Sequence, residues 1–117
     1  MASPVPNLND GTANFDPIPY QVISATGTAI TLGKKRVILT YAGATANTLA
    51  APTNPDMNGF VMDIVSTVAQ AHVITATNLI NGNDDTLTWA AAIANSCSLM
   101  AYNGEWLTMN LTGVTVG

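Results

Sequence analysis

The stretch Ala101-Tyr102-Asn103-Gly104-Glu105-Trp106-Leu107 places an Asn-Gly dipeptide between two apolar runs. Asn-Gly is the strongest short-range signal for a β-hairpin, because a type I′ turn needs positive φ at both of its central residues. The same dipeptide recurs at Asn58-Gly59 and at Asn81-Gly82, each time beside a run of strand-forming residues. This punctuation predicts an all-β domain of antiparallel strands.

Further strand signals extend along most of the chain. Apolar and polar residues alternate with a period of two over 28–32 and 86–89, as they do in half-buried strands. The run 59–66 is the most apolar of the expected strands. The other expected strands are 20–24, 36–41, 47–50, 72–76, 98–102 and 106–110, with a helical turn or a loop at 90–95. Strand-like runs about every ten residues predict an antiparallel β-sandwich or a barrel-like domain.

Residues 1–19 differ from the rest of the chain, because they hold four prolines and no run with strand periodicity. Proline has no amide hydrogen for ladder pairing and biases the preceding residue toward extended backbone. The sequence therefore predicts an extended N-terminal arm at 1–19 and a single all-β domain at 20–117. Phe15, Ile18 and Tyr20 are the apolar anchors if the arm orders on a neighbouring subunit. A flexible tail is the alternative.

Charge is scarce in this chain. Only 9% of its 117 residues are charged, against roughly 25% in an ordinary soluble domain. Such a surface gives little repulsion between copies and suits a protein whose faces are buried against other protein. The net charge of −4 disfavours a nucleic-acid partner. All three basic residues lie together as Lys34, Lys35 and Arg36, which indicates either a solvated turn or a positive patch that docks on an acidic surface.

Few residues are suited to catalysis or to metal binding. His72 is the only histidine and no G-x-S-x-G motif accompanies it, so we expect a histidine bonded to backbone and no enzyme. Cys97 is the only cysteine, which excludes an internal disulfide and indicates a small buried strand residue. Asp84 and Asp85 fit a polar turn better than a calcium site, which takes about six to eight oxygen ligands. No cofactor is expected.

No run in the chain approaches the ~18 apolar residues of a membrane helix, and no secretory signal begins it. We therefore expect no membrane partner and folding in a reducing cytoplasm. The large aromatic residues of the strands are expected in the core or in a subunit interface: Phe60, Trp89, Tyr102 and Trp106. A platform for sugar stacking is the alternative for the two tryptophans.

Four segments resemble those of small virion proteins of tailed bacteriophages. They are Leu49-Ala50-Ala51-Pro52-Thr53, the Gly-led run 58–67, Ala71-His72-Val73-Ile74-Thr75, and the closing run 99–106 with its Tyr-Asn-Gly-Glu-Trp turn. The resemblance spans about residues 28–117 and leaves the arm outside it. Proteins of this kind include capsid decoration (cementing) proteins and modules of head or tail fibres.

The resemblance implies a structural subunit without enzymatic activity, a homotrimer bound to the major capsid protein on the outside of an assembled phage head. Such a protein is made in the host bacterial cytoplasm and ends on the outer surface of the virion. The expected capsid contacts are Phe15, Ile18, Tyr20, Lys34, Lys35 and Arg36. A fibre module that binds host carbohydrate and a ring-forming tail-tube or neck component are the alternatives. A chain of 117 residues that begins at Met1 is short for a fibre shaft and tip, which favours decoration.

Overall fold

A computed structural model describes residues 18–117, in which the chain forms β-strands joined by turns and loops and no helix. The strands are β1 (Tyr20–Ile23), β2 (Arg36–Leu39), β3 (Ala46–Thr48), β4 (Val61–Ser66), β5 (Val73–Ile80), β6 (Asp84–Trp89), β7 (Ser96–Tyr102), β8 (Glu105–Thr112) and β9 (Val114–Val116). The prediction of an all-β domain is confirmed for this part of the chain. The expected arm lies almost wholly outside the described residues.

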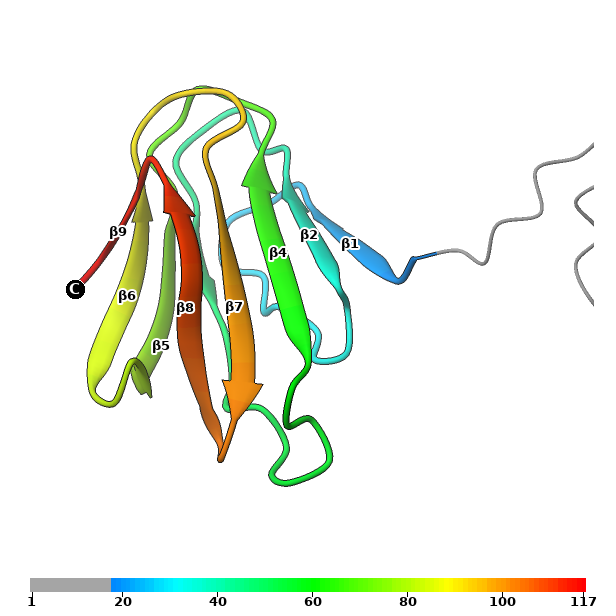
Figure 1. The fold of residues 1–117 in the computed structure, drawn as a ribbon. Helices are drawn as coiled ribbons and strands as arrows, with labels where there is room; N and C mark the ends of the chain where they lie inside the picture. The colour runs from blue at the N-terminus through cyan, green and yellow to red at the C-terminus, as the bar shows by residue number, and fades with distance from the viewer. Residues whose placement is uncertain (1–17) are drawn as a thin grey trace, which may run out of the picture.

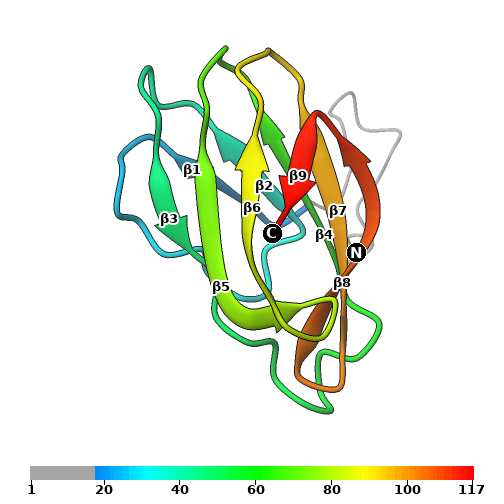
Figure 2. The same cartoon turned by 90° about the vertical axis from the view of Figure 1, so that its left-hand side faces the viewer.

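The strands belong to one mixed sheet that folds over into two layers (Figures 1 and 2). Their hydrogen-bonded order is β1-β2-β4-β7-β8-β5-β6-β9, and β3 pairs with β5. One layer holds β1, β2, β4, β7 and β8, and the other holds β3, β5, β6 and β9. The layers are joined where Ile80 of β5 pairs with Trp106 of β8. The result is compatible with the expected sandwich or barrel-like domain.

The strand pairing is mixed, whereas the hairpin signals had predicted antiparallel strands throughout. The pairs β1–β2, β2–β4, β3–β5 and β5–β8 run parallel, while β4–β7, β7–β8, β5–β6 and β6–β9 run antiparallel. A tight turn specifies an antiparallel neighbour, but parallel strands need a long crossover connection that carries no such local signal. The sequence therefore predicts the hairpins but gives no local signal for the parallel pairs.

Two of the three Asn-Gly dipeptides form the expected turns. Asn103 and Gly104 have φ of 54° and 79°, so both central residues of the β7–β8 turn are left-handed, as a type I′ turn requires. Asn81 and Gly82 also have positive φ and begin the connection between β5 and β6. At the third dipeptide only Gly59 is left-handed, and it leads from a loop into β4.

The alternating run 28–32 forms no strand, because a side chain takes the place of a strand partner. The Gln21 amide donates from Nε2 to the carbonyl of Ala29 at 3.1 Å, and its Oε1 accepts the amide of Thr31 at 2.8 Å. Ala29 adds a single parallel bridge to Thr48 of β3. These contacts link the edge of one layer to the edge of the other. Residues 90–95 form bends and turns, and β9 is a strand that the sequence did not predict.

The core lies between the two layers and contains both tryptophans. The indole of Trp89 donates to the carbonyl of Asn95, and that of Trp106 donates to the carbonyl of Ala50, each at 2.9 Å. A buried indole N–H needs such a partner, since burial removes it from water. Phe60 is partly buried against the core, while Tyr102 is 57% exposed at the end of β7.

The different burial of the two aromatic residues on the β7–β8 hairpin gives a test of the core. We expect Trp106→Ala to lower the free energy of unfolding by about 3–5 kcal/mol, because it empties a large buried site. Trp106→Phe should cost less, since it mainly leaves the Ala50 carbonyl without its donor. Tyr102→Ala, the control on the same hairpin, should change stability by no more than ~0.5 kcal/mol. Denaturant unfolding measures all three, and an equal loss for Tyr102→Ala would contradict this arrangement.

Candidate interaction surface

The structure brings together the expected capsid-contact residues that it describes. The carbonyl of Pro19 accepts the amides of Lys35 at 2.9 Å and Arg36 at 3.3 Å, and Tyr20 lies opposite Arg36 in the parallel β1–β2 ladder. Residues far apart in sequence thus meet where the described chain begins. This arm corner consists of Ile18, Tyr20, Lys34, Lys35 and Arg36. Phe15 lies outside the described residues.

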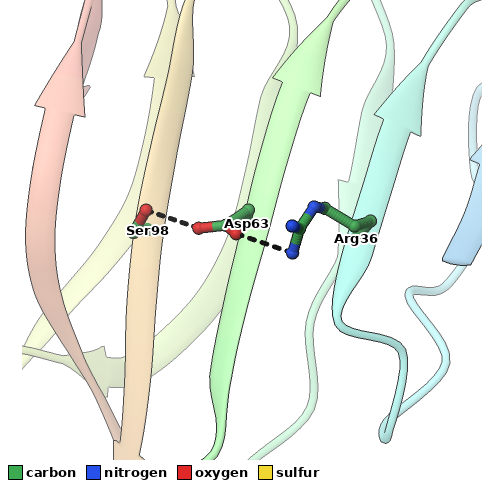
Figure 3. Close-up of polar contacts among 3 residues, drawn as sticks. All are labelled: Arg36, Asp63 and Ser98. Atoms are coloured by element: carbon green, nitrogen blue, oxygen red, sulfur yellow. Dashed lines mark hydrogen bonds and ion pairs between the residues drawn. The ribbon is translucent and has the colours of Figure 1, made fainter. Parts of the chain in front are cut away.

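Of the three basic residues of the arm corner, Arg36 forms an ion pair within residues 18–117 and the two lysines do not. Arg36 Nη1 lies 3.0 Å from Oδ2 of Asp63 on β4, and the Ser98 hydroxyl of β7 donates to Oδ1 of the same carboxylate at 2.5 Å (Figure 3). An exposed ion pair contributes about 0–1 kcal/mol, so its main effect here is to fix the Arg36 side chain across the sheet. The two lysines supply the positive charge that a partner would meet.

Two rows of aliphatic side chains cross the outward side of the five-stranded layer. Strand register places one row across β1, β2 and β4 and the other across β4, β7 and β8. Each of these side chains alternates with buried residues of its strand and is itself half-buried or exposed. We call these rows the apolar face: Val22, Ile38 and Val65 in the first, and Val61, Met100 and Leu107 in the second.

The outward side of the other layer has a different chemistry. Register aligns Thr48, Thr75 and Thr86 across β3, β5 and β6, and it pairs Thr88 with Thr115 across β6 and β9. We call these five residues the threonine face. Their hydroxyls can hydrogen-bond to water, and β-branched side chains suit a pleated surface. The domain therefore has one outward side rich in threonine and one that carries two aliphatic rows, with the polar row Arg36, Asp63 and Ser98 between them.

Sequence reasoning missed the apolar face, although one signal pointed to it. Val61, Met62, Ile64 and Val65 make β4 apolar on both of its sides, and a strand of this kind is typical of a sheet covered on both faces. The alternation of the neighbouring strands could not reveal the face, since the two rows depend on which strands are neighbours.

His72 lies in a buried polar network at one end of the domain. The amide of Thr45 donates to His72 Nδ1 at 3.3 Å, and the Thr45 hydroxyl lies 2.9 Å from the same nitrogen. Because an amide can only donate, Nδ1 accepts, and Nε2 carries the proton that it donates to Ser66 Oγ at 3.1 Å. The Ser66 hydroxyl donates in turn to the carbonyl of Val68 at 2.7 Å. The expected bond between His72 and backbone is confirmed, and the network ties the β2–β3 connection to the β4–β5 connection.

Protonation of His72 would disrupt this network. A proton on Nδ1 would face the donors of Thr45, and burial lowers the pKa of His72 below its usual value of about 6.5. Below that value the unfolded chain binds more protons than the folded chain, so stability must fall as the pH falls. The contribution is complete above the unfolded pKa and decreases toward the lower folded pKa.

We therefore expect unfolding free energy to be nearly constant above about pH 7 and to drop below about pH 6.5, by at most ~1.4 kcal/mol per pH unit from this group. His72→Gln should be less stable at neutral pH but should show a flatter profile between about pH 7.5 and pH 5.5. Urea unfolding at a series of pH values measures both chains. Parallel profiles for the two chains would contradict the assignment to His72.

Cys97 and Asp85, two other residues that the sequence analysis considered, both have structural roles. Burial, with a smaller effect from the Asp63 carboxylate, raises the pKa of the Cys97 thiol to about 12. Cys97 is thus the buried strand residue that was expected. Asp85 Oδ1 accepts the amide of Asn78 at 2.7 Å, where β5 has a left-handed residue and a shift of register. This carboxylate supports a local irregularity of the strand.

Comparison with protein-family models and with curated proteins found no match to this chain. Within residues 18–117, no pocket is present and no three His, Cys, Asp or Glu side chains are grouped as metal ligands would be. The same residues contain no helix long and apolar enough to span a membrane. The arm corner, the apolar face and the threonine face are the surfaces from which a function can be argued.

Proposed function

We propose that this protein is a capsid decoration subunit, a structural virion protein that binds the outside of an assembled phage head as a trimer. The observation that carries the proposal is the arm corner. The arm joins the domain beside Lys34, Lys35 and Arg36, which are all the basic residues of the chain. A partner can therefore be held by apolar anchors of the arm and by positive charge at one place.

The partner that fits this corner is a protein surface with apolar sites for the arm and acidic groups for the lysines. We assign this role to the major capsid protein. Ile18 is 49% exposed and Tyr20 is 58% exposed, so both side chains are available as anchors together with Phe15 of the arm. Lys35 is exposed and Lys34 half-buried beside them. With a net charge of −4 and few charges overall, no nucleic-acid or membrane partner is proposed.

Stabilisation of the head would follow from mass action. A ligand that binds the assembled shell but not its separated subunits stabilises the assembled form by its free energy of binding. Three linked arms would act together, because binding of the first raises the effective concentration of the others. The protein needs no catalytic group and no cofactor for this role, and its place is the outer surface of the virion.

The alternative of a carbohydrate-binding fibre module has less support. Trp89 and Trp106, the residues expected to stack on sugars in that case, lie in the core with no exposed surface. Carbohydrate stacking would instead have to use exposed tyrosines such as Tyr20, Tyr41 or Tyr102. These tyrosines belong to separate parts of the chain, in β1, after β2 and at the end of β7.

Removal of the arm tests its role in capsid binding. A chain that lacks residues 2–16 should remain a folded trimer, because the described strands begin after the deletion. We expect its affinity for capsids without the decoration subunit to fall at least ~10-fold, which corresponds to about 1.4 kcal/mol. Co-sedimentation over a range of concentrations measures the affinity, and circular dichroism checks the fold. Binding equal to that of the full chain would contradict a role for the arm.

A second variant tests the charge of the arm corner. Replacement of Lys34, Lys35 and Arg36 by alanine should weaken capsid binding and reduce its dependence on salt between about 0.05 and 0.5 M. The matched control is Lys34→Arg with Lys35→Arg, which keeps the charge and should bind as the unaltered chain does. An identical salt dependence for the alanine variant and the unaltered chain would show that this charge plays no part.

A further inference from the structure

We infer that the apolar face is the contact between copies of this chain. The inference concerns a surface that shares only Arg36 with the proposed capsid contacts, which are at the arm and the arm corner. It rests on the proposed function in one respect, which is the expectation that three copies associate. Large apolar patches on the outside of a folded domain mark interaction sites.

The threonine face provides an internal comparison. Both faces lie on the outward sides of the same folded sheet, so the two differ in composition and not in the kind of backbone that carries them. On the outward side of the second layer, β6 carries Thr86 and Thr88, and β5 carries Val73 beside Thr75. At the equivalent outward positions of β4 the chain uses Val61 and Val65. The apolar face therefore has the composition of a covered surface.

The charges on this side of the sheet favour a second copy as the occupant. Asp63 lies between Val61 and Val65 on β4, and its carboxylate is neutralised by Arg36 and bound by Ser98 (Figure 3). The centre of the face is therefore neutral, and Glu105 at the hairpin end of β8 is the one further charge of these strands on this side, so the face offers little net charge to an acidic or basic partner. A second copy presents the same apolar rows and the same pair of opposite charges. The Arg36 and Asp63 side chains are 46% and 37% exposed, so each can also approach the opposite charge of another copy.

The size of this side of the layer is sufficient for such a contact. Five strands at ~4.8 Å spacing and about six residues at ~3.3 Å per residue cover roughly 24 by 20 Å. Around a threefold axis each copy turns this side toward both of its neighbours, and three copies together bury on the order of 1,400 Å². Copies that meet through this face would leave the threonine face toward solvent, and the arm corner would lie at the margin of the contact, at the start of β1 and β2.

The test introduces charge at the centre of the face and at a matched position on the other side. Val65→Lys and Met100→Lys place a lysine on β4 and β7 of the apolar face, and Thr75→Lys and Thr88→Lys are the controls on the threonine face. Light scattering after size-exclusion chromatography measures the mass without any capsid present. We expect a trimer for the unaltered chain and for both controls, and a monomer or at least ~100-fold weaker association for the two apolar-face variants.

Circular dichroism and thermal unfolding show whether each variant keeps its fold. Should Val65→Lys or Met100→Lys unfold, Val22→Lys provides the same test on the edge strand β1, where the side chain is already 47% exposed. A monomeric unaltered chain, or apolar-face variants that keep the mass of the unaltered chain, would overturn the inference.

Capsid co-sedimentation separates this inference from the proposed function. A trimer that the apolar-face variants disrupt, and that binds no capsid in its unaltered form, would support the inference and contradict the proposed function. Apolar-face variants that remain trimeric but no longer bind capsids would identify the face as a capsid contact. That second result would overturn the inference and leave the proposed function in place.

Discussion

The two layers of this domain depend on the burial of Trp106. Its backbone pairs with Ile80 and so joins β8 to β5, the point at which the sheet passes from one layer to the other. Its carbonyl accepts the amide of Asn81, and its indole N–H donates to the carbonyl of Ala50. Trp106 therefore links the β7–β8 hairpin to the β5–β6 turn and to the loop between β3 and β4. A single buried aromatic group with all of its polar atoms satisfied can hold a fold of short strands, because it combines apolar burial with directional bonds.

This arrangement leaves the two outward sides of the sheet free to differ. The core is filled from both layers by alternate residues, so the remaining residues of each strand are not constrained by packing inside the domain. One side carries threonines and the other carries aliphatic rows around Asp63 and Arg36. A domain built in this way can place solvent, neighbouring copies and a capsid at separate surfaces. That arrangement is what the proposed assembly role would use.

Polar groups inside the domain serve its structure. Gln21 replaces a strand partner at the sheet edge, and His72 and Ser66 bond to the connections that precede β3 and follow β4. Each of them compensates for short strands that leave backbone groups without ladder partners. The scarcity of charge is consistent with this use, since neutral side chains satisfy the backbone at a smaller desolvation cost than ions do.

The sequence by itself determined the all-β class, the β7–β8 hairpin and the buried cysteine, because turn chemistry and alternation are local properties of Asn103-Gly104 and of the strands beside it. It also singled out the basic residues at 34–36 and the anchors near Tyr20, but without any sign that they meet. Only the tertiary structure decided that meeting, the parallel pairs and the two aliphatic rows. Each of these depends on which strands become neighbours, and neighbours such as β2 and β4 are chosen by the packing of the whole core, which no short window of sequence records.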